Sequence, residues 1–485
     1  MPQCIIVSVF GESRASALLR EIYLCLTPTL GGMVGISGLG LSWEDLVRHY
    51  LAGALGAFIS VAISSTALAE TLTIATVNNG DMIRMQKLTD AFKAKNPDID
   101  LQWVTLEENV LRQKVTTDIA TKGGQYDVLT IGTYEVPIWS KLGWLAPLDK
   151  LTADKTYDVD DLLPAIRSGL TTDGKLYAAP FYGESSMVMY RKDLFEKAGL
   201  KMPDAPTWTF IADAARKITD KSHEVYGICL RGKAGWGENM AFLTATANSF
   251  GARWFDEKWK PQFDQPEWKS TLDFYVKLMK DAGPPGASSN GFNENLSLFQ
   301  TGKCGMWIDA TVAASFVSDP KESKVADKVG FALAPDNGLG KRGNWLWAWN
   351  LAIPASSKKT EAAEKFIAWA TGKDYTNLVA EKEGWLNAPP GTRSSLYANA
   401  DYQKAAPFAK MTLDSINSAD PTHPTVKPVP YVGVQFVAIP EFQGIGTAVG
   451  QQFSAALAGQ ITVDAALKAA QQLTTREMTK AGYPK

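Results

Sequence analysis

Strand-like and helical segments alternate along residues 71–131. The strand-like segments are rich in β-forming side chains, and the last is almost continuously apolar, which is typical of a strand covered on both faces. Between them, apolar residues recur at helical spacing. Alternating strands and helices predict a parallel sheet with helices on both faces. We expect strands at residues 71–77, 99–103 and 126–131, and helices at residues 85–96 and 110–119.

Polar residues follow the first and third of these strands. Ligands of such sheets bind beyond the carboxyl ends of the strands, so this edge is a candidate site. Asn78 and Asn79 could instead form only a turn, because asparagine is favoured in turns. The candidates are Asn78, Asn79 and Asp81 after the first strand, and Tyr134 and Glu135 after the third.

The middle of the chain is predicted to be mostly helical, and strand patterns return later. Polar, Gly-rich loops interrupt the helices at residues 231–239 and 283–291. The later elements are strands at residues 305–309 and 345–354, a helix with Thr360 as its N-cap, and a last helix that opens at Thr462.

The composition is ordinary for a globular chain of two or three domains, with 485 residues, 45% hydrophobic and 21% charged. The formal net charge of −2 opposes nucleic-acid binding, which requires a basic surface. No Lys/Arg cluster suits an anionic membrane surface. The His, Cys and Asp residues show no spacing typical of a metal site, and we expect neither a metal nor a cofactor.

The N-terminal region has the pattern of a secretory signal peptide. Arg48 precedes the short apolar run 51–63, and Ala67-Leu68-Ala69 follows as a cleavage site. The run is too short to span a bilayer comfortably, and a buried helix is the alternative. We expect export to the periplasm with cleavage near Ala69. No lipid anchor is expected, because no cysteine lies beside the site. Residues 1–47 are interpreted as an over-extended start.

Two cysteines follow the cleavage site, Cys229 and Cys304. In an oxidising compartment they could form a disulfide. They could equally be two small buried residues. The sequence leaves both interpretations open.

Four segments stand out along the chain: PFYGESSMVMYRKDLF at residues 180–195, FQTGKCGMWID at 299–309, WNLAIP at 349–354 and GQITVDAAL at 459–467. Together and in this order, they resemble segments of the family 1 extracellular solute-binding proteins of bacterial ABC transporters, to which the maltodextrin-binding proteins belong. Within that family, the residues ATVNNGDMIR (75–84) and WLWAW (345–349) resemble the sorbitol/mannitol-type, or polyol, binding proteins.

The resemblance implies an α/β fold of the periplasmic binding protein-like type II, with two α/β lobes and a ligand cleft and hinge between them. The lobes would close around the ligand by hinge motion. Crossings between the lobes are expected near residues 181–184, 349–351 and 395–405. After the leader 1–69, the first lobe would comprise residues 70–181 plus about 351–400, and the second residues 182–349 plus about 401–485.

The resemblance also implies a function and a partner. The chain is expected to be the monomeric, exported substrate-binding component of an ABC importer. It would capture a neutral polyol, a sorbitol- or mannitol-like alditol, and deliver it to the membrane permease without catalysing a reaction. A mono- or disaccharide, or a glycerol-phosphate ester, is an alternative ligand. A phosphate would require a basic site, whereas the candidates are acidic and aromatic.

A secreted carbohydrate-active enzyme is the alternative class of protein. Such an enzyme would also have a tryptophan-lined cleft and paired carboxylates. The ordered family segments oppose it, and no G-x-S-x-G nucleophile motif follows the predicted signal peptide. Release of reducing ends from glycosides would separate the two classes.

A polyol presents hydroxyl groups and apolar C–H strips, so its site needs acceptors, donors and aromatic faces. Trp345, Trp347 and Trp349 share one side of a strand because side chains alternate. A core ladder of tryptophans is the alternative. Arg393 could equally form an ion pair between the lobes. The remaining ligand candidates are Tyr182 and Glu184 at the first crossing, Trp236 in a loop, Asp309 at a strand end, Trp347, Trp349, Asn387, Arg393 and Phe442.

Overall fold

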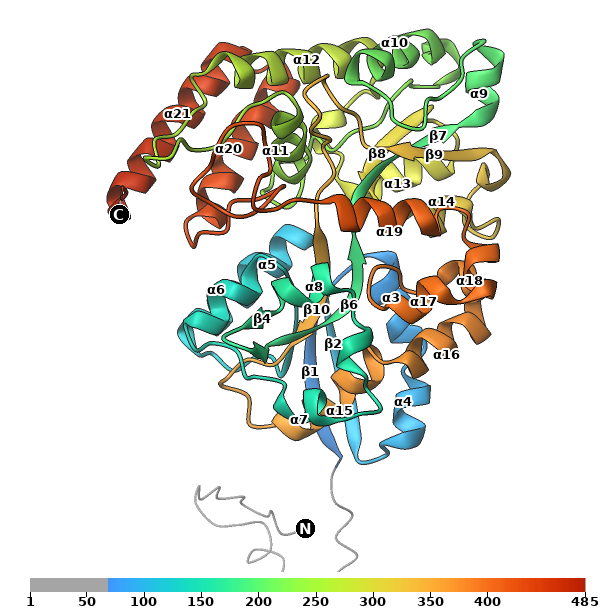
Figure 1. The fold of residues 1–485 in the computed structure, drawn as a ribbon, viewed down its shortest axis with the longest axis vertical. Helices are drawn as coiled ribbons and strands as arrows, with labels where there is room; N and C mark the ends of the chain where they lie inside the picture. The colour runs from blue at the N-terminus through green and yellow to red at the C-terminus, as the bar shows by residue number, and fades with distance from the viewer. Residues whose placement is uncertain (1–68, 485) are drawn as a thin grey trace, which may run out of the picture. The chain divides into compact units, whose positions relative to one another are not determined.

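The computed structural model describes residues 69–484, which are drawn in colour in Figure 1. The predicted signal peptide and the segment before it lie outside the described residues, apart from Ala69. Among residues 69–484, none of the helices is both long and apolar enough to cross a membrane.

A five-stranded sheet with the order β2-β1-β3-β10-β6 forms the centre of what we call the first lobe. β1, β2 and β3 run parallel, as the sequence predicts. β10 runs antiparallel between β3 and β6, so the sheet is mixed rather than parallel throughout. The strands are β1 (Glu70–Val77), β2 (Ile99–Leu106), β3 (Val128–Gly132), β6 (Ala178–Glu184) and β10 (Trp347–Ala352).

Helices surround this sheet, with α5 and α6 on one side and α3, α4 and α16 on the other in Figure 1. A short hairpin of β4 (Thr171–Thr172) and β5 (Lys175–Leu176) packs beside α6 and α7. The helices are α3 (Gly80–Lys87), α4 (Asp90–Lys95), α5 (Glu108–Thr121), α6 (Glu135–Lys141), α7 (Asp149–Ala153), α8 (Pro164–Gly169), α15 (Thr360–Ala370), α16 (Lys373–Glu383) and α17 (Ser394–Ala398).

Two helix predictions need correction. The single helix expected over residues 85–96 is two helices, because the N–H of Leu88 bonds to the carbonyl of Met85 and closes α3 with a tight turn. Thr360 is not an N-cap, since α15 already includes it and no side chain caps that helix. Thr462 does cap α21, where its hydroxyl accepts a hydrogen bond from the N–H of Ala465.

The second lobe is built on a three-stranded antiparallel sheet with the order β8-β7-β9. Helices from the middle and the end of the chain pack around it (Figure 1). The strands are β7 (Ser186–Arg191), β8 (Met306–Ala310) and β9 (Val329–Leu333). The helices are α9 (Lys192–Lys197), α10 (Trp208–Ile218), α11 (Asn239–Ser249), α12 (Pro266–Ala282), α13 (Phe292–Gln300), α14 (Ala313–Ser318), α19 (Ala409–Ser418), α20 (Phe442–Leu457) and α21 (Val463–Lys480).

The chain passes between the two sheets at strand ends. β6 continues through Ser185 directly into β7, so one extended segment belongs to both sheets (Figure 1). Ser185 and Thr311 fix this crossing. The N–H of Ser185 donates to the Thr311 hydroxyl at 3.1 Å, and the N–H of Thr311 donates to the Ser185 carbonyl at 2.8 Å. The chain returns to the first sheet between β9 and β10, and it crosses again near α18 (Ala400–Ala405). The exact residue limits of the lobes stay a prediction.

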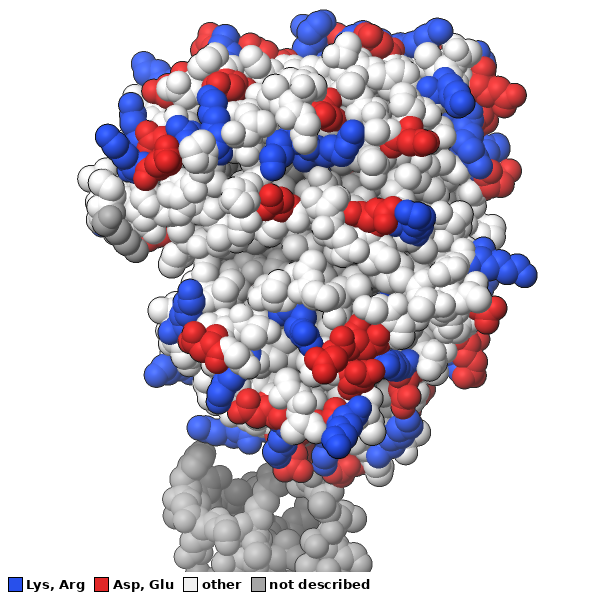
Figure 2. Space-filling view, viewed as in Figure 1, with Lys and Arg blue, Asp and Glu red and all other residues white. Residues whose placement is uncertain are grey.

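Charged residues of both signs cover the two lobes, without a face of one sign in the view of Figure 2. The band where the lobes meet is mostly uncharged on that face. This distribution agrees with the net charge of −2. The charges that matter for the site are instead buried between the lobes.

Cys229 and Cys304 form a disulfide in the second lobe, with their Cα atoms 5.9 Å apart. Both residues are also fully buried. Of the two interpretations that the sequence leaves open, the structure therefore shows the pair. The bond closes a loop of 75 residues in sequence separation, and that loop contains Arg231 and Trp236, whose positions become important below.

We predict that the double substitution Cys229→Ser and Cys304→Ser lowers the free energy of unfolding by about 2–4 kcal/mol, since the cross-link restricts the unfolded chain. Chemical denaturation of both proteins measures the difference. The unchanged protein should lose the same stability when dithiothreitol is added, whereas the double variant should not respond. Equal stability of both proteins without reductant would contradict the prediction.

Candidate functional site

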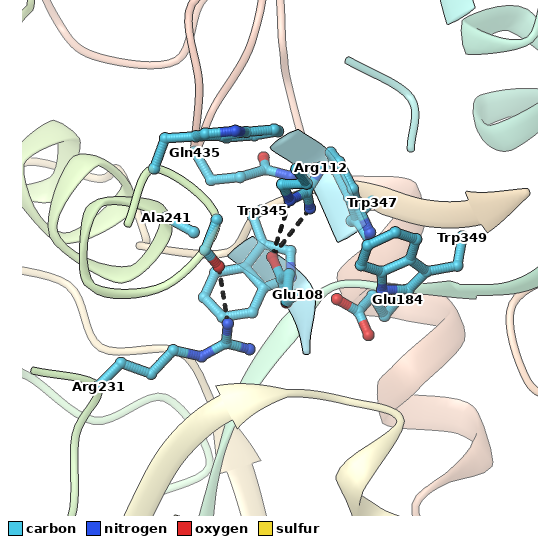
Figure 3. A pocket seen from close by; sticks show the side chains of 11 residues that line it. Glu108, Arg112, Glu184, Arg231, Ala241, Trp345, Trp347, Trp349 and Gln435 are labelled. Carbon is cyan, nitrogen blue, oxygen red and sulfur yellow. Dashed lines mark hydrogen bonds and ion pairs between the residues drawn. The ribbon is translucent and has the colours of Figure 1, made fainter. Parts of the chain in front are cut away.

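Two adjoining cavities lie between the lobes and share Glu108, Glu184, Arg231 and Trp349 in their walls. Figure 3 shows the first cavity, where aromatic rings and charged groups converge from both lobes. Its other lining residues are Arg112, Trp236, Gly237, Ala241, Trp345, Trp347 and Gln435. The second cavity is also lined by Val77, Asn78, Asn79, Glu107, Tyr182, Lys233, Glu238, Phe292, Asn293, Glu294, Ala310 and Val312.

The register of β10 places the tryptophans in this site. Trp347 lies opposite Glu184, and Trp349 lies opposite Tyr182 on β6. Because side chains two apart on a strand share a face, both rings point to the same side. Gly132 on the neighbouring strand β3 allows this arrangement, since a Cβ there would lie 1.9 Å from the ring of Trp347.

Arg112 on α5 occupies the centre of the aromatic wall. Its guanidinium lies 4.0 Å from the ring centroid of Trp236, 5.0 Å from that of Trp347 and 4.8 Å from that of Trp349. Cations are attracted to the faces of such rings. Two carboxylates neutralise the charge: Nη2 donates to Glu108 at 2.9 Å, and Nη1 donates to Glu135 at 2.7 Å.

Arg231 plays the corresponding part on the second lobe. Its Nε and Nη2 donate to the two oxygens of Asp309 at 2.9 and 2.6 Å, and its Nη1 donates to the carbonyl of Gly237 at 2.9 Å. Asp309 also accepts a hydrogen bond from Trp307 and is completely buried. Asp309 therefore holds Arg231 in the cavity wall and does not itself line either cavity.

Two buried glutamates at the site have raised pKa values. Burial raises the pKa of Glu184 well above its ordinary value, although the charge of Arg231 opposes the shift. Burial, together with the charge of Glu108, raises the pKa of Glu238 to about 8, against the charges of Arg231 and Lys233. Within residues 69–484, neither Oε2 of Glu238 nor Nε1 of Trp236 has a hydrogen-bond partner. Because buried polar groups without partners are costly, these groups favour a polar ligand.

The structure brings seven of the fourteen sequence-predicted site residues to the cavities. Asn79 also caps α3 and donates to the hydroxyl of Tyr182, so its turn role and a position at the site are combined. Whether each of the seven contacts a ligand stays a prediction. They are Asn78, Asn79, Tyr182, Glu184, Trp236, Trp347 and Trp349.

Asp81 and Asn387 instead belong to a chain of polar contacts that joins the lobes. Arg84 donates to Asp81 at 2.8 Å and to the Asn387 side-chain oxygen at 3.0 Å. The amide of Asn387 then donates to Asp319 of the second lobe at 2.8 Å. Burial raises the pKa of Asp81 to about 6, although Arg84 lowers it. We call Asp81, Arg84, Asn387 and Asp319 the latch.

The other four candidates line neither cavity. Glu135 holds Arg112, and its second oxygen accepts the N–H of Gly132 at 2.9 Å. Tyr134 and Phe442 pack within an aromatic cluster beside Trp236. Arg393 donates to the carbonyls of Asp158 and Thr371 inside the first lobe, and it lies 3.5 Å from Asp161, so it forms no ion pair between lobes. A direct ligand contact by these residues has no support in their positions.

Sequence reasoning missed several residues that line the cavities. Glu107 and Glu108 follow the second strand, so the strand-end rule that selected Asn78 applied to them as well. Arg231 and Glu238 lie in the Gly-rich loop 231–239, where only Trp236 was selected. Gln435 lies in an irregular segment, and no sequence signal marks it. The side chains present suit no metal site, since no group of three His, Cys, Asp or Glu residues able to hold one occurs among the described residues.

The chain belongs to the bacterial extracellular solute-binding proteins, whose family model matches residues 79–377. It is 61% identical over 417 residues to a mannitol-binding protein of Pseudomonas aeruginosa. The matched residues make up 86% of this chain and 95% of that protein. The family predicted from the four sequence segments is thereby confirmed.

Two crystal structures are similar to the described fold. One is an ABC transporter solute-binding protein of Agrobacterium vitis with bound D-mannitol. Its sequence is 86% identical and its TM-score is 0.86, and the match covers 86% of this chain and all of that one. The other is a solute-binding protein of Agrobacterium radiobacter in complex with ribitol, 28% identical, with a TM-score of 0.75, covering 84% of this chain and 98% of that one. The predicted type II fold is therefore confirmed.

We predict that stability of the ligand-free protein falls as the pH rises from about 4.5 to about 8, and that Glu238→Gln reduces this fall. In that window the folded protein holds a proton on Glu238 that the unfolded chain, with a pKa near 4.5, has already released. A rising pH therefore favours unfolding. Melting temperatures at several pH values measure the slope. Glu257→Gln, at an exposed glutamate of the same lobe, should keep the original slope, and an equal slope for Glu238→Gln would refute the prediction.

Proposed function

We propose that this chain is the substrate-binding component of an ABC importer, which captures a neutral polyol of the mannitol type and delivers it to a membrane permease. The observation that carries the proposal is the mannitol-bound relative, which is 86% identical over its whole length. The 61% identical mannitol-binding protein and the ribitol-bound structure support a polyol as the ligand.

The chemistry of the cavities fits such a ligand. An alditol has many hydroxyl groups that both donate and accept, and an apolar carbon chain. Glu184 and Glu238 offer buried acceptors, while Arg231 and the free Nε1 of Trp236 offer donors. Trp347 and Trp349 offer flat apolar faces to the carbon chain. Acidic residues exceed basic ones around the cavities, which favours a neutral ligand over a phosphate ester.

We further propose that the protein is exported to the periplasm through the predicted signal peptide and acts there without catalysing a reaction. The family and the similar proteins are all substrate-binding proteins. The disulfide supports an oxidising compartment. The clustered glutamates have a binding role in this proposal, as acceptors for hydroxyl groups, rather than the role of a general acid and base.

We predict that D-mannitol binds the protein purified from Glu70 onward and raises its melting temperature. A ligand that binds only the folded state adds about 2.7 kcal/mol of stability at a hundredfold excess over its dissociation constant. Calorimetric titration with D-mannitol, ribitol, maltose and glycerol 3-phosphate measures the preference. Binding of maltose or glycerol 3-phosphate without binding of an alditol would overturn the proposed ligand while leaving the family intact.

We predict that Glu184→Gln weakens mannitol binding roughly 2- to 10-fold. A hydrogen bond between uncharged groups contributes about 0.5–1.5 kcal/mol, each 1.4 kcal/mol is tenfold in affinity, and the raised pKa of Glu184 favours its uncharged form. The amide keeps the shape of the side chain but replaces one carboxyl oxygen with an NH2 donor, so the change reports the loss of a hydrogen-bond acceptor. Calorimetric titration measures it, with Glu196→Gln at an exposed glutamate of α9 as the control. Unchanged affinity of Glu184→Gln would remove Glu184 from the proposed site.

A further inference from the structure

One end of the first cavity is closed by two residues from opposite lobes. Arg112 comes from α5 of the first lobe, and Trp236 comes from the Gly-rich loop of the second. The guanidinium lies 4.0 Å from the ring centroid of Trp236. Figure 3 shows Arg112 near Trp347, with dashed lines from its guanidinium to Glu108. The pair therefore forms a wall that exists only when the lobes are together.

The position of Arg112 is fixed on all sides. Its bonds to Glu108 and Glu135 use three of its N–H groups, through Nε, Nη1 and Nη2. Gly237 packs closely against Arg112 and Glu108, because a Cβ at Gly237 would lie 2.1 Å from Glu108 Oε1 and 3.0 Å from Arg112 Nε. A guanidinium has five N–H donors. The remaining ones are available to a hydroxyl group at the end of a ligand.

A buried aromatic cluster packs against Trp236 in this wall. Tyr134 lies 4.7 Å from Trp236 and 5.6 Å from Phe436 between ring centroids. Trp347 lies 6.0 Å from Phe436. On its far side, Phe436 lines a wide, mostly apolar groove that is separate from the two site cavities and that also includes Leu142 and Val432, both exposed. Arg112 and the cluster thus divide the ligand cavity from this groove.

We propose that Arg112, stacked on Trp236, limits the length of the ligand that this protein accepts. The inference rests on the proposed function, and it deepens that function by naming the residue pair that selects a short acyclic polyol. The last hydroxyl of a six-carbon chain ends against the guanidinium. A longer ligand, such as a glycosyl alditol, has no space beyond it.

Contacts beside the pair connect ligand length to closure of the lobes. Lys233 pairs with Glu107 at 2.7 Å, and Asn109 donates to the carbonyl of Ala234 at 3.3 Å. Both contacts join the start of α5 to the loop that carries Trp236. A ligand that displaces Trp236 from Arg112 would therefore also separate these groups. A ligand that is too long therefore lacks space and also prevents the contacts that hold the two lobes together.

The test is a titration series with the unchanged protein, Arg112→Ala and Trp236→Ala, using erythritol, D-arabitol, D-mannitol, a seven-carbon alditol and maltitol. The expected result is that the unchanged protein prefers D-mannitol, and that both variants raise the affinity for maltitol relative to D-mannitol by about tenfold or more, the size of discrimination that pocket shape provides. Trp385→Ala, at a tryptophan outside the cleft, should keep the original ratio.

Two failures are distinguishable in this series. Absence of alditol binding by the unchanged protein would defeat the proposed function, and the inference with it. Binding of D-mannitol with an unchanged maltitol ratio in the variants would defeat only the inference. Arg112→Ala leaves Glu108 and Glu135 without their partner and can impair folding. Trp236→Ala opens the same end of the cavity from the other lobe without unpairing a charge, so it decides the outcome in that case.

Discussion

The pairing of β10 with β6 determines where every part of the site can lie. β6 runs on through Ser185 into the second sheet, so its last residue, Glu184, stands at the junction of the lobes. The register sets Trp347 opposite Glu184. A shift of one residue would turn both Trp347 and Trp349 to the other face of the sheet. One antiparallel pair thus combines the connection between lobes with the aromatic and acidic walls of the cavity.

The closed arrangement depends on a balance of buried charges. Arg112 is held by Glu108 and Glu135, and Arg231 is held by Asp309. Breaking a buried pair is costly because it leaves a charge without a partner. Both arginines keep their acidic partners within one lobe, so opening the cleft need not unpair them. Opening the cleft instead breaks contacts between the lobes, such as the buried hydrogen bond from Asn387 to Asp319 and the partly exposed ion pair of Lys233 with Glu107.

The sequence predicted the elements well where local pattern determines them. The first three strands, α5 and the cap at Thr462 follow from spacing and propensity alone. The antiparallel direction of β10 did not, because direction depends on the path of the chain through the second lobe. The latch shows the same limit for the site. Asp81 follows a strand end as expected, but Arg84, one helical turn later, draws it toward Asn387, about 300 residues away in sequence.

The roles of Glu135 and Asp309 follow one physical rule that a single sequence does not reveal. A carboxylate at a strand end can face a ligand or hold a cation, and the nearest arginine decides between them. Arg112 and Arg231 come from α5 and from a loop, and they lie 23 and 78 residues away in sequence from Glu135 and Asp309. Among residues 69–484, no arginine donates a hydrogen bond to Glu184, which lies in the shared wall of both cavities. Glu135 and Asp309 therefore hold the arginines of the walls, whereas Glu184 and Glu238 are left to receive hydroxyl groups.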